Sequence, residues 1–147
     1  NGLDQVAFLF SANKGSALME IEKVASGGEL SRLMLAIKSI ITDSTMLPTV
    51  VFDEIDTGIS GEIAGKVALL MQKISQQHQL LVITHLPQIA AKGKLHYFVF
   101  KEVVNGKTYT NIKPVSGAER ELEIAKMMSG DHLSQAAIAA AKELINS

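Results

Sequence analysis

The feature of this sequence that most constrains its fold is a pair of short apolar runs, each of which ends abruptly in polar residues. The runs cover residues 49–52 and 80–83. Between them, apolar side chains recur at the three- and four-residue spacing of an amphipathic helix, at Ile63, Val67, Leu70, Met71 and Ile74. Two continuous apolar strands joined by a helix are typical of a parallel sheet with both faces covered. We therefore expect an α/β fold, with a mostly parallel sheet flanked by helices.

The first apolar run ends in two adjacent carboxylates, Asp53 and Glu54. In open α/β sheets, ligands bind in the crevice at the carboxyl ends of the strands, so this pair would face such a crevice. One carboxylate there can hold Mg²⁺ together with water, while the other polarises an attacking water molecule. The alternative is that the pair only caps the following helix.

A glycine-containing motif, Ser26-Gly27-Gly28-Glu29, precedes this strand and opens a second helical pattern that extends to Ile41. A serine followed three residues later by a glutamate forms a capping box, and a helix start of this kind requires no ligand. In the functional interpretation, the two glycines leave backbone N–H groups accessible at a helix N-terminus, which attracts phosphate. The motif taken alone leaves both interpretations open.

The second apolar run is followed by His85. A lone histidine at this position is usually solvated or caps a helix, whereas a histidine beside a γ-phosphate would report the state of a nucleotide. The glycine-rich helix start, the strand with Asp-Glu and the strand with histidine occur in one order along the chain. That order and spacing resemble the C-terminal half of an ABC-type ATPase head.

The rest of the chain carries structural signals and no further chemistry. An apolar run at residues 6–10 predicts a strand, and Asn105-Gly106 is a favoured hairpin turn between strands at residues 96–101 and 108–113. Two helices close the chain, near residues 119–128 and 134–144, with Gly130 as the expected C-cap between them. We see no internal repeat or linker, and therefore expect one domain over residues 1–147.

Composition excludes several classes of protein. Hydrophobic residues make up 47% and charged residues 20% of the 147, as in ordinary globular proteins, and the net charge of -1 gives no basic signal for nucleic acid. The absence of cysteine excludes disulfides and thiolate metal sites. No apolar run reaches the ~18 residues of a membrane-spanning helix, and the first residues given do not show the charged, apolar and small-residue pattern of a signal peptide. Because the first residue is Asn1, we expect the chain to be part of a longer protein.

Four segments carry a closer resemblance. They are residues 24–32 (VASGGELSR), 52–61 (FDEIDTGISG), 83–91 (ITHLPQIAA) and 123–130 (EIAKMMSG). The first resembles the ABC signature segment of the RecN family of SMC-like ATPases. The second is similar to its Walker B motif and D-loop, the third to its switch-histidine segment and the fourth to its close. The similarity runs over nearly the whole chain.

The resemblance implies a role for each motif. Asp53 would hold Mg²⁺ and Glu54 would be the general base, while His85 would be the switch histidine. Ser26, Gly27, Gly28 and Glu29 would contact ATP bound on a partner head, so Gly28→Asp is expected to block head engagement while sparing the fold. The D-loop aspartate of many ABC and SMC proteins falls at Ser60, and either Asp56 or Ser60 could make the D-loop contact.

The chain contains no Walker A motif, so the loop and the lysine that hold the phosphates of ATP would have to come from elsewhere. The family is built with its Walker A lobe before a long coiled coil and the present segment after it. The resemblance thus implies a bacterial DNA double-strand-break repair and recombination ATPase, cytoplasmic and nucleoid-associated, with ATP and Mg²⁺ as cofactors. Its partners would be its own N-terminal Walker A lobe, a second head in an ATP-sandwiched homodimer, and DNA; no membrane is expected.

Three alternatives remain. A transporter nucleotide-binding domain typically has glutamine where this chain has Glu29, and proline where it has Ile55. Another SMC-class chromosome-structure protein would usually end the D-loop in Leu-Asp. In a non-enzymatic module the same motifs would only cap helices. For the fragment by itself, little or no ATPase activity is expected.

Overall fold

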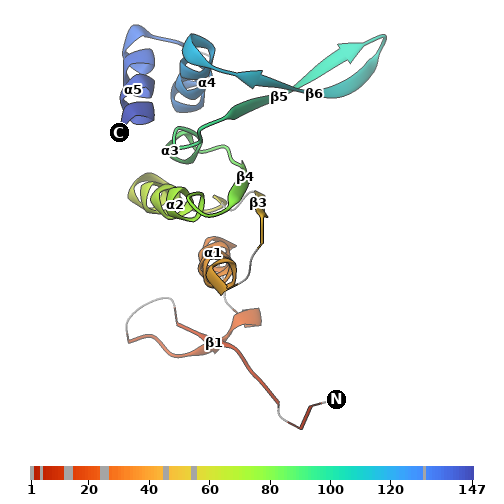
Figure 1. Ribbon diagram of the computed structural model, residues 1–147, viewed down its shortest axis with the longest axis vertical. Coiled ribbons are helices and arrows are strands. Elements are labelled where there is room, and N and C mark those ends of the chain that lie inside the picture. Colours follow the sequence, from red (N-terminus) through yellow and green to blue (C-terminus); the bar gives the residue numbers. More distant parts are fainter. Residues whose placement is uncertain are drawn as a thin grey trace.

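The structure is a computed structural model that describes residues 2–3, 5–11, 15–23, 27–44, 47–53, 56–130 and 132–147. The predicted site residues Ser26 and Glu54 lie outside these ranges, as does the side chain of Glu29. The elements follow one another along a long axis, with the N-terminus at one end and the α4–α5 pair at the other (Figure 1). Their bounds are β1 Leu9–Phe10, β2 Met19–Glu20, η1 Ile21–Lys23, α1 Gly27–Ser44, β3 Thr49–Asp53, α2 Gly61–Ile74, β4 Gln79–Ile83, α3 Pro87–Ala90, β5 His96–Val104, β6 Lys107–Val115, α4 Gly117–Ser129 and α5 Gln135–Asn146.

The two apolar runs form β3 and β4, which precede and follow the crossover helix α2 in the sequence and pair with each other in parallel. Their register places Val50 beside Leu80 and Asp53 beside Ile83. A parallel pair needs a crossover connection, and the amphipathic segment between the runs supplies it as a 14-residue helix. The β–α–β arrangement predicted from the sequence is thus confirmed.

The expectation of a mostly parallel sheet was wrong. The described strands form three two-stranded sheets, and only β3–β4 is parallel; β1–β2 and β5–β6 are antiparallel. The physical reason lies in the connections, because antiparallel neighbours need only a tight turn, whereas each further parallel strand needs another long crossover. The apolar run at residues 6–10 also contributes only two residues, Leu9–Phe10, to a strand.

Only one face of the β3–β4 pair is covered within the described chain. Val50 and Phe52 point into a core built with α1, α2 and α3. The alternate residues Val51, Leu81 and Ile83 leave 50%, 49% and 55% of their surface exposed. The apolar runs predicted two covered faces, and the second face of this pair has no cover from the described residues.

The hairpin prediction is confirmed, and both strands are longer than expected. Asn105 and Gly106 have φ angles of 52° and 75°, the positive values that a type I′ turn requires at both central positions. Nine residues pair on each side, from His96 opposite Val115 to Val104 opposite Lys107. The hairpin extends sideways from the long axis of the molecule (Figure 1).

The two predicted C-terminal helices, α4 and α5, pack against each other around a small second core of Ile124, Ala125 and Ala141. Gly130 is the C-cap of α4 with φ of 68°, as predicted. Ser134 caps α5 by accepting a hydrogen bond from the Ala137 N–H at 3.1 Å. The alanine-rich face of α5 allows this close packing.

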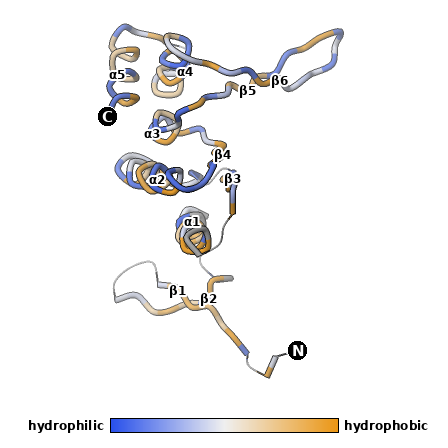
Figure 2. Tube along the Cα trace, in the orientation of Figure 1, coloured by the Kyte–Doolittle hydropathy of each residue, from blue (hydrophilic) through white to orange (hydrophobic). Residues whose placement is uncertain are grey.

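Sequence patterns missed the short elements, namely β2, η1 and the four-residue helix α3. None of the helices formed by the described residues is long and apolar enough to cross a membrane. Figure 2 shows apolar colouring along the β1–β2 segment, where Val6, Phe8, Leu9, Leu18 and Met19 are all largely exposed.

Candidate nucleotide-binding edge

The parallel register brings the chemistry-bearing residues of the two apolar runs to one edge. Asp53 is the last residue of β3 and pairs with Ile83, the last residue of β4, so Asp53 and the Thr84-His85 segment leave the sheet together. The side chain of His85 is 69% exposed, and Asp53 is also exposed. The sequence predicted the parallel pairing of the two runs, and this pairing places both strand ends at one edge.

Asp56, three residues beyond Asp53, is fully buried and ties the two strand ends together. Its Oδ2 accepts a hydrogen bond from the Thr84 hydroxyl, from the His85 N–H at 2.9 Å and from the Leu86 N–H at 3.2 Å. The Nδ1 atom of His85 lies 3.3 Å from the same oxygen. Thr84 Oγ1 accepts a second bond from the Leu86 N–H at 3.0 Å, which closes a compact turn after β4.

The electrostatics of this cluster favour an ionised Asp56. Burial raises the pKa of the carboxyl group, but the hydrogen bonds from the Thr84 hydroxyl and the His85 N–H outweigh it, and the net pKa is lowered from 3.8. A buried carboxylate can remain ionised when hydrogen-bond donors satisfy it in this way. The second oxygen, Oδ1, is buried and has no hydrogen-bond partner among the described residues.

The N-terminus of α1 lies against the segment that follows Asp56. An added Cβ on Gly28 would lie 2.9 Å from the carbonyl oxygen of Gly58, closer than side chains tolerate. Gly58 itself has φ of +75°, in the left-handed region that favours glycine. The two glycines thus let the N-terminus of α1 touch the segment that contains Gly58. This contact counts against the expectation that Gly28→Asp leaves the fold undisturbed, because any side chain at this position meets the Gly58 backbone.

The two candidates for the D-loop contact differ in accessibility. Asp56 has no exposed surface, and its Oδ2 accepts hydrogen bonds from groups within the chain. Ser60 is exposed at the N-cap of α2 and makes no side-chain capping hydrogen bond. It borders an open hollow of about 260 Å³ whose other walls are Gly61, Leu86, Pro87, Gln88, Met127 and Met128. Of the two, Ser60 has the geometry suited to a contact with another molecule.

The donor set at this edge fits a shared magnesium site. Mg²⁺ is usually held by one or two carboxylates together with substrate phosphates and water, and the exposed Asp53 would be one such ligand. Within the described ranges, no group of three or more histidines and carboxylates could hold a metal by itself. Further ligands would come from the nucleotide and from residues outside this set.

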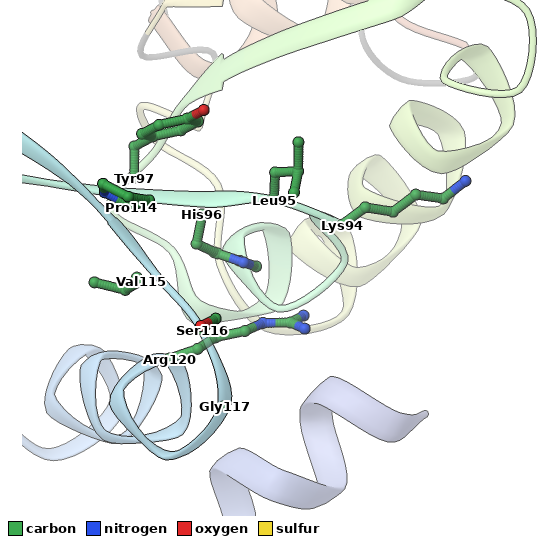
Figure 3. A pocket seen from close by; sticks show the side chains of 9 residues that line it. All are labelled: Lys94, Leu95, His96, Tyr97, Pro114, Val115, Ser116, Gly117 and Arg120. Atoms are coloured by element: carbon green, nitrogen blue, oxygen red, sulfur yellow. The ribbon is translucent and has the colours of Figure 1, made fainter.

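A second cluster, which sequence reasoning missed, lies away from this edge (Figure 3). His96 and Arg120 point from β5 and α4 toward the turn after α3, beside a pocket of about 170 Å³. The His96 Nε2–H donates to the Ala90 carbonyl at 2.5 Å, and Arg120 donates to the carbonyls of Ala91 and Gly93. These bonds satisfy the carbonyls of Ala90, of the C-cap Ala91 and of Gly93 in the following turn, so the cluster stabilises the end of α3.

Burial lowers the pKa of His96 from 6.5, and although the bond to the Ala90 carbonyl opposes this, the charge of Arg120 adds to it. His96 is therefore neutral at physiological pH, with its proton on Nε2. No sequence pattern indicated the contact of His96 with the end of α3, because a histidine that begins a strand looks like any other polar strand residue.

Comparison with known proteins adds to this geometry. The chain is 45% identical over 146 residues to a Rickettsia conorii protein named "DNA repair protein RecN", and 46% identical over 144 residues to the Bacillus subtilis protein of that name. A Xylella fastidiosa protein of the same name is 46% identical over 145 residues. These matches cover 98–99% of the chain. The chain is a RecN-like segment. It spans about a quarter of the length of these curated relatives (25–27%), and no protein-family model matches it.

Solved structures agree on the fold of this RecN-like segment. A chain from work on ATP-driven dimerization and DNA-stimulated activation of SMC ATPases superposes with a TM-score of 0.58 at 24% identity, covering 81% of this chain and 70% of that one. The Smc head domain with coiled coil and joint from Pyrococcus yayanosii gives 0.62 at 23% identity, over 78% of this chain and 21% of that one. The fold is that of part of an SMC ATPase head.

Proposed function

We propose that this chain supplies the hydrolytic half of an ATP-binding head in a DNA double-strand-break repair and recombination ATPase of the RecN type. The observation that carries the proposal is the meeting of Asp53 and the Thr84-His85 turn at the carboxyl edge of β3–β4. The relatives that bear the name DNA repair protein RecN support it. They do not favour a transporter domain or another SMC-class chromosome protein.

In this mechanism each residue at the edge has one task. Asp53 would hold Mg²⁺, which when bound offsets the charge of the β- and γ-phosphates. Glu54 would accept the proton of the attacking water, and His85 would donate to the γ-phosphate as its charge redistributes. Ser26, Gly27, Gly28 and Glu29 would present the α1 N-terminus to ATP on a second head, with the exposed Ser60 beside them.

The exposed face of β3–β4 supports the proposal that another part of the same protein packs against it. Val51, Leu81 and Ile83 are apolar and about half exposed, and such residues in a parallel strand are normally covered. An N-terminal lobe with the Walker A loop would cover this face and supply the phosphate-binding lysine. ATP would then join two such heads, the full-length protein would contact DNA, and its location would be the bacterial cytoplasm and nucleoid.

The test is Glu54→Gln in a full-length protein that carries this chain. Because only water activation is removed, we expect ATP binding to persist, turnover to fall by at least about 100-fold, and head dimers to accumulate with ATP. The matched control is Glu62→Gln, which changes an exposed glutamate on α2 that pairs with Lys66 at 2.8 Å. Normal turnover in the Glu54→Gln protein, or loss of its nucleotide binding, would refute the general-base role.

A further inference from the structure

The buried carboxylate of Asp56 has more donors than a simple fold contact requires. Three donors converge on Oδ2, and all of them belong to the Thr84–Leu86 turn that carries His85. The exposed fraction of Asp56 is 0%, whereas the His85 side chain is 69% exposed. A fully buried anion therefore holds the base of an exposed histidine.

The same oxygen also lies beside the histidine ring. The Nδ1 atom of His85 is 3.3 Å from Asp56 Oδ2, and a carboxylate at this distance favours a proton on Nδ1. Histidines in catalytic sites are commonly oriented in this way by a carboxylate, which fixes the ring and its tautomer. With the proton on Nδ1 the other ring nitrogen, Nε2, is an acceptor in the neutral ring, so the donation to the γ-phosphate proposed above requires a ring that carries protons on both nitrogens.

We propose that Asp56 is a positioning residue that couples the segment after β3 to the switch histidine: it holds the Thr84–His85–Leu86 turn and orients the His85 ring through Nδ1. This inference rests on the proposed function, because it gives the orientation of His85 a role in ATP hydrolysis. It differs from the D-loop role expected for Asp56, which required the side chain to reach a second head. The carboxylate acts within one head, through His85.

The geometry makes the coupling direct. Asp56 follows Asp53 by three residues on the β3 side, while its bonds end on the β4 side. A displacement of Asp56 would therefore be transmitted to the base of His85 through its hydrogen bonds with the His85 N–H at 2.9 Å and the Leu86 N–H at 3.2 Å. Water activation and γ-phosphate contact would thus be assembled together.

The first experiment is spectroscopic and needs no nucleotide. The full-length protein is labelled with ¹⁵N-histidine, and the ring signals of His85 are assigned from the His85→Ala variant. We expect the wild-type ring to carry its proton on Nδ1, and the Asp56→Asn variant to lose this preference, because the amide keeps the shape but removes the charge. Unchanged His85 ring signals in Asp56→Asn would overturn the inference.

The second experiment is a double-mutant cycle in steady-state ATPase assays of the full-length protein. Asp56→Asn is expected to lower kcat by about 10- to 100-fold, the usual cost of losing an orienting partner, with little change in KM for ATP. If Asp56 acts through His85, the Asp56→Asn/His85→Ala protein turns over no more slowly than His85→Ala alone. Multiplied losses in the double variant would overturn the coupling.

Thr84 provides a second route that does not touch the charge. Thr84→Val removes the hydroxyl donor at constant shape, and Thr84→Ser keeps it; we expect a loss of kcat in the first variant and recovery in the second. Glu62→Gln is again the surface control. Should His85→Ala leave turnover unchanged, the proposed role of His85 in hydrolysis fails, and the ring spectra still decide whether Asp56 orients it.

Discussion

Replacing Gly28 with alanine sets two effects of opposite sign against each other. Gly28 lies in the first turn of α1, where alanine has the higher helix propensity by at most ~1 kcal/mol. The added Cβ, however, would lie 2.9 Å from the Gly58 carbonyl oxygen and 3.3 Å from its carbon. Both are backbone atoms, so no side-chain rotation relieves the contact.

The cost of the close contact is larger than the gain in helix propensity, so Gly28→Ala is expected to destabilise the protein. Forcing an extra carbon into a packed site costs about 1–3 kcal/mol, so Gly28→Ala should lower the free energy of unfolding by a net ~1–2 kcal/mol. For a chain of this size that corresponds to a fall in Tm of about 2–8 °C. Gly65 is the matched control, because it lies within α2 and nothing stands within 4 Å of an added Cβ. Gly65→Ala should stabilise the protein by ~0.5–1 kcal/mol.

The assay is urea unfolding without nucleotide, which separates packing from any effect on phosphate binding. We expect the two Gly→Ala variants to move the midpoint in opposite directions at constant slope. A Gly28→Ala protein as stable as the wild type, measured beside a stabilised Gly65→Ala protein, would refute the close approach of α1 to Gly58. Gly28 would then matter only as a phosphate-binding residue.

Two further predictions concern a helix cap and a buried histidine. Ser134→Ala should lower the free energy of unfolding by about 0.5–2 kcal/mol, because it removes the acceptor of the Ala137 N–H. Ser116→Ala should lower it less, because Ser116 makes no side-chain capping bond. Equal urea midpoints for the two variants would count against the α5 cap. Because the pKa of His96 is lowered from 6.5 in the folded state, the unfolded chain binds more protons, and stability is full above about pH 6.5 and falls as the pH drops toward the folded-state pKa. His96→Gln keeps a donor for the Ala90 carbonyl and should flatten this loss between about pH 7.5 and 5.5; an unchanged pH slope of the urea midpoint would contradict the neutral His96.

Local patterns along the chain determined the elements that carry the candidate site. Alternation of apolar runs with a helical period specified β3, α2 and β4, and the Asn105-Gly106 pair specified the hairpin, because both depend on neighbours within a few residues. The parallel pairing then followed from the crossover, and with it the meeting of Asp53 and His85 at one edge. The resemblance to RecN rested on the residues and order of four short segments, which need no tertiary structure to be read.

Only the tertiary structure decided which oxygen meets which donor. The burial of Asp56, its bonds to the Thr84–Leu86 turn and the contact of Gly28 with Gly58 join residues about 30 apart, and no local pattern encodes such distances. The tertiary structure also decided which strands pair in each sheet, since strand pairing depends on connections and partners as well as on apolar runs. The sequence thus specified what the edge contains, while packing specified that Asp56 lies beneath it and holds His85 in place.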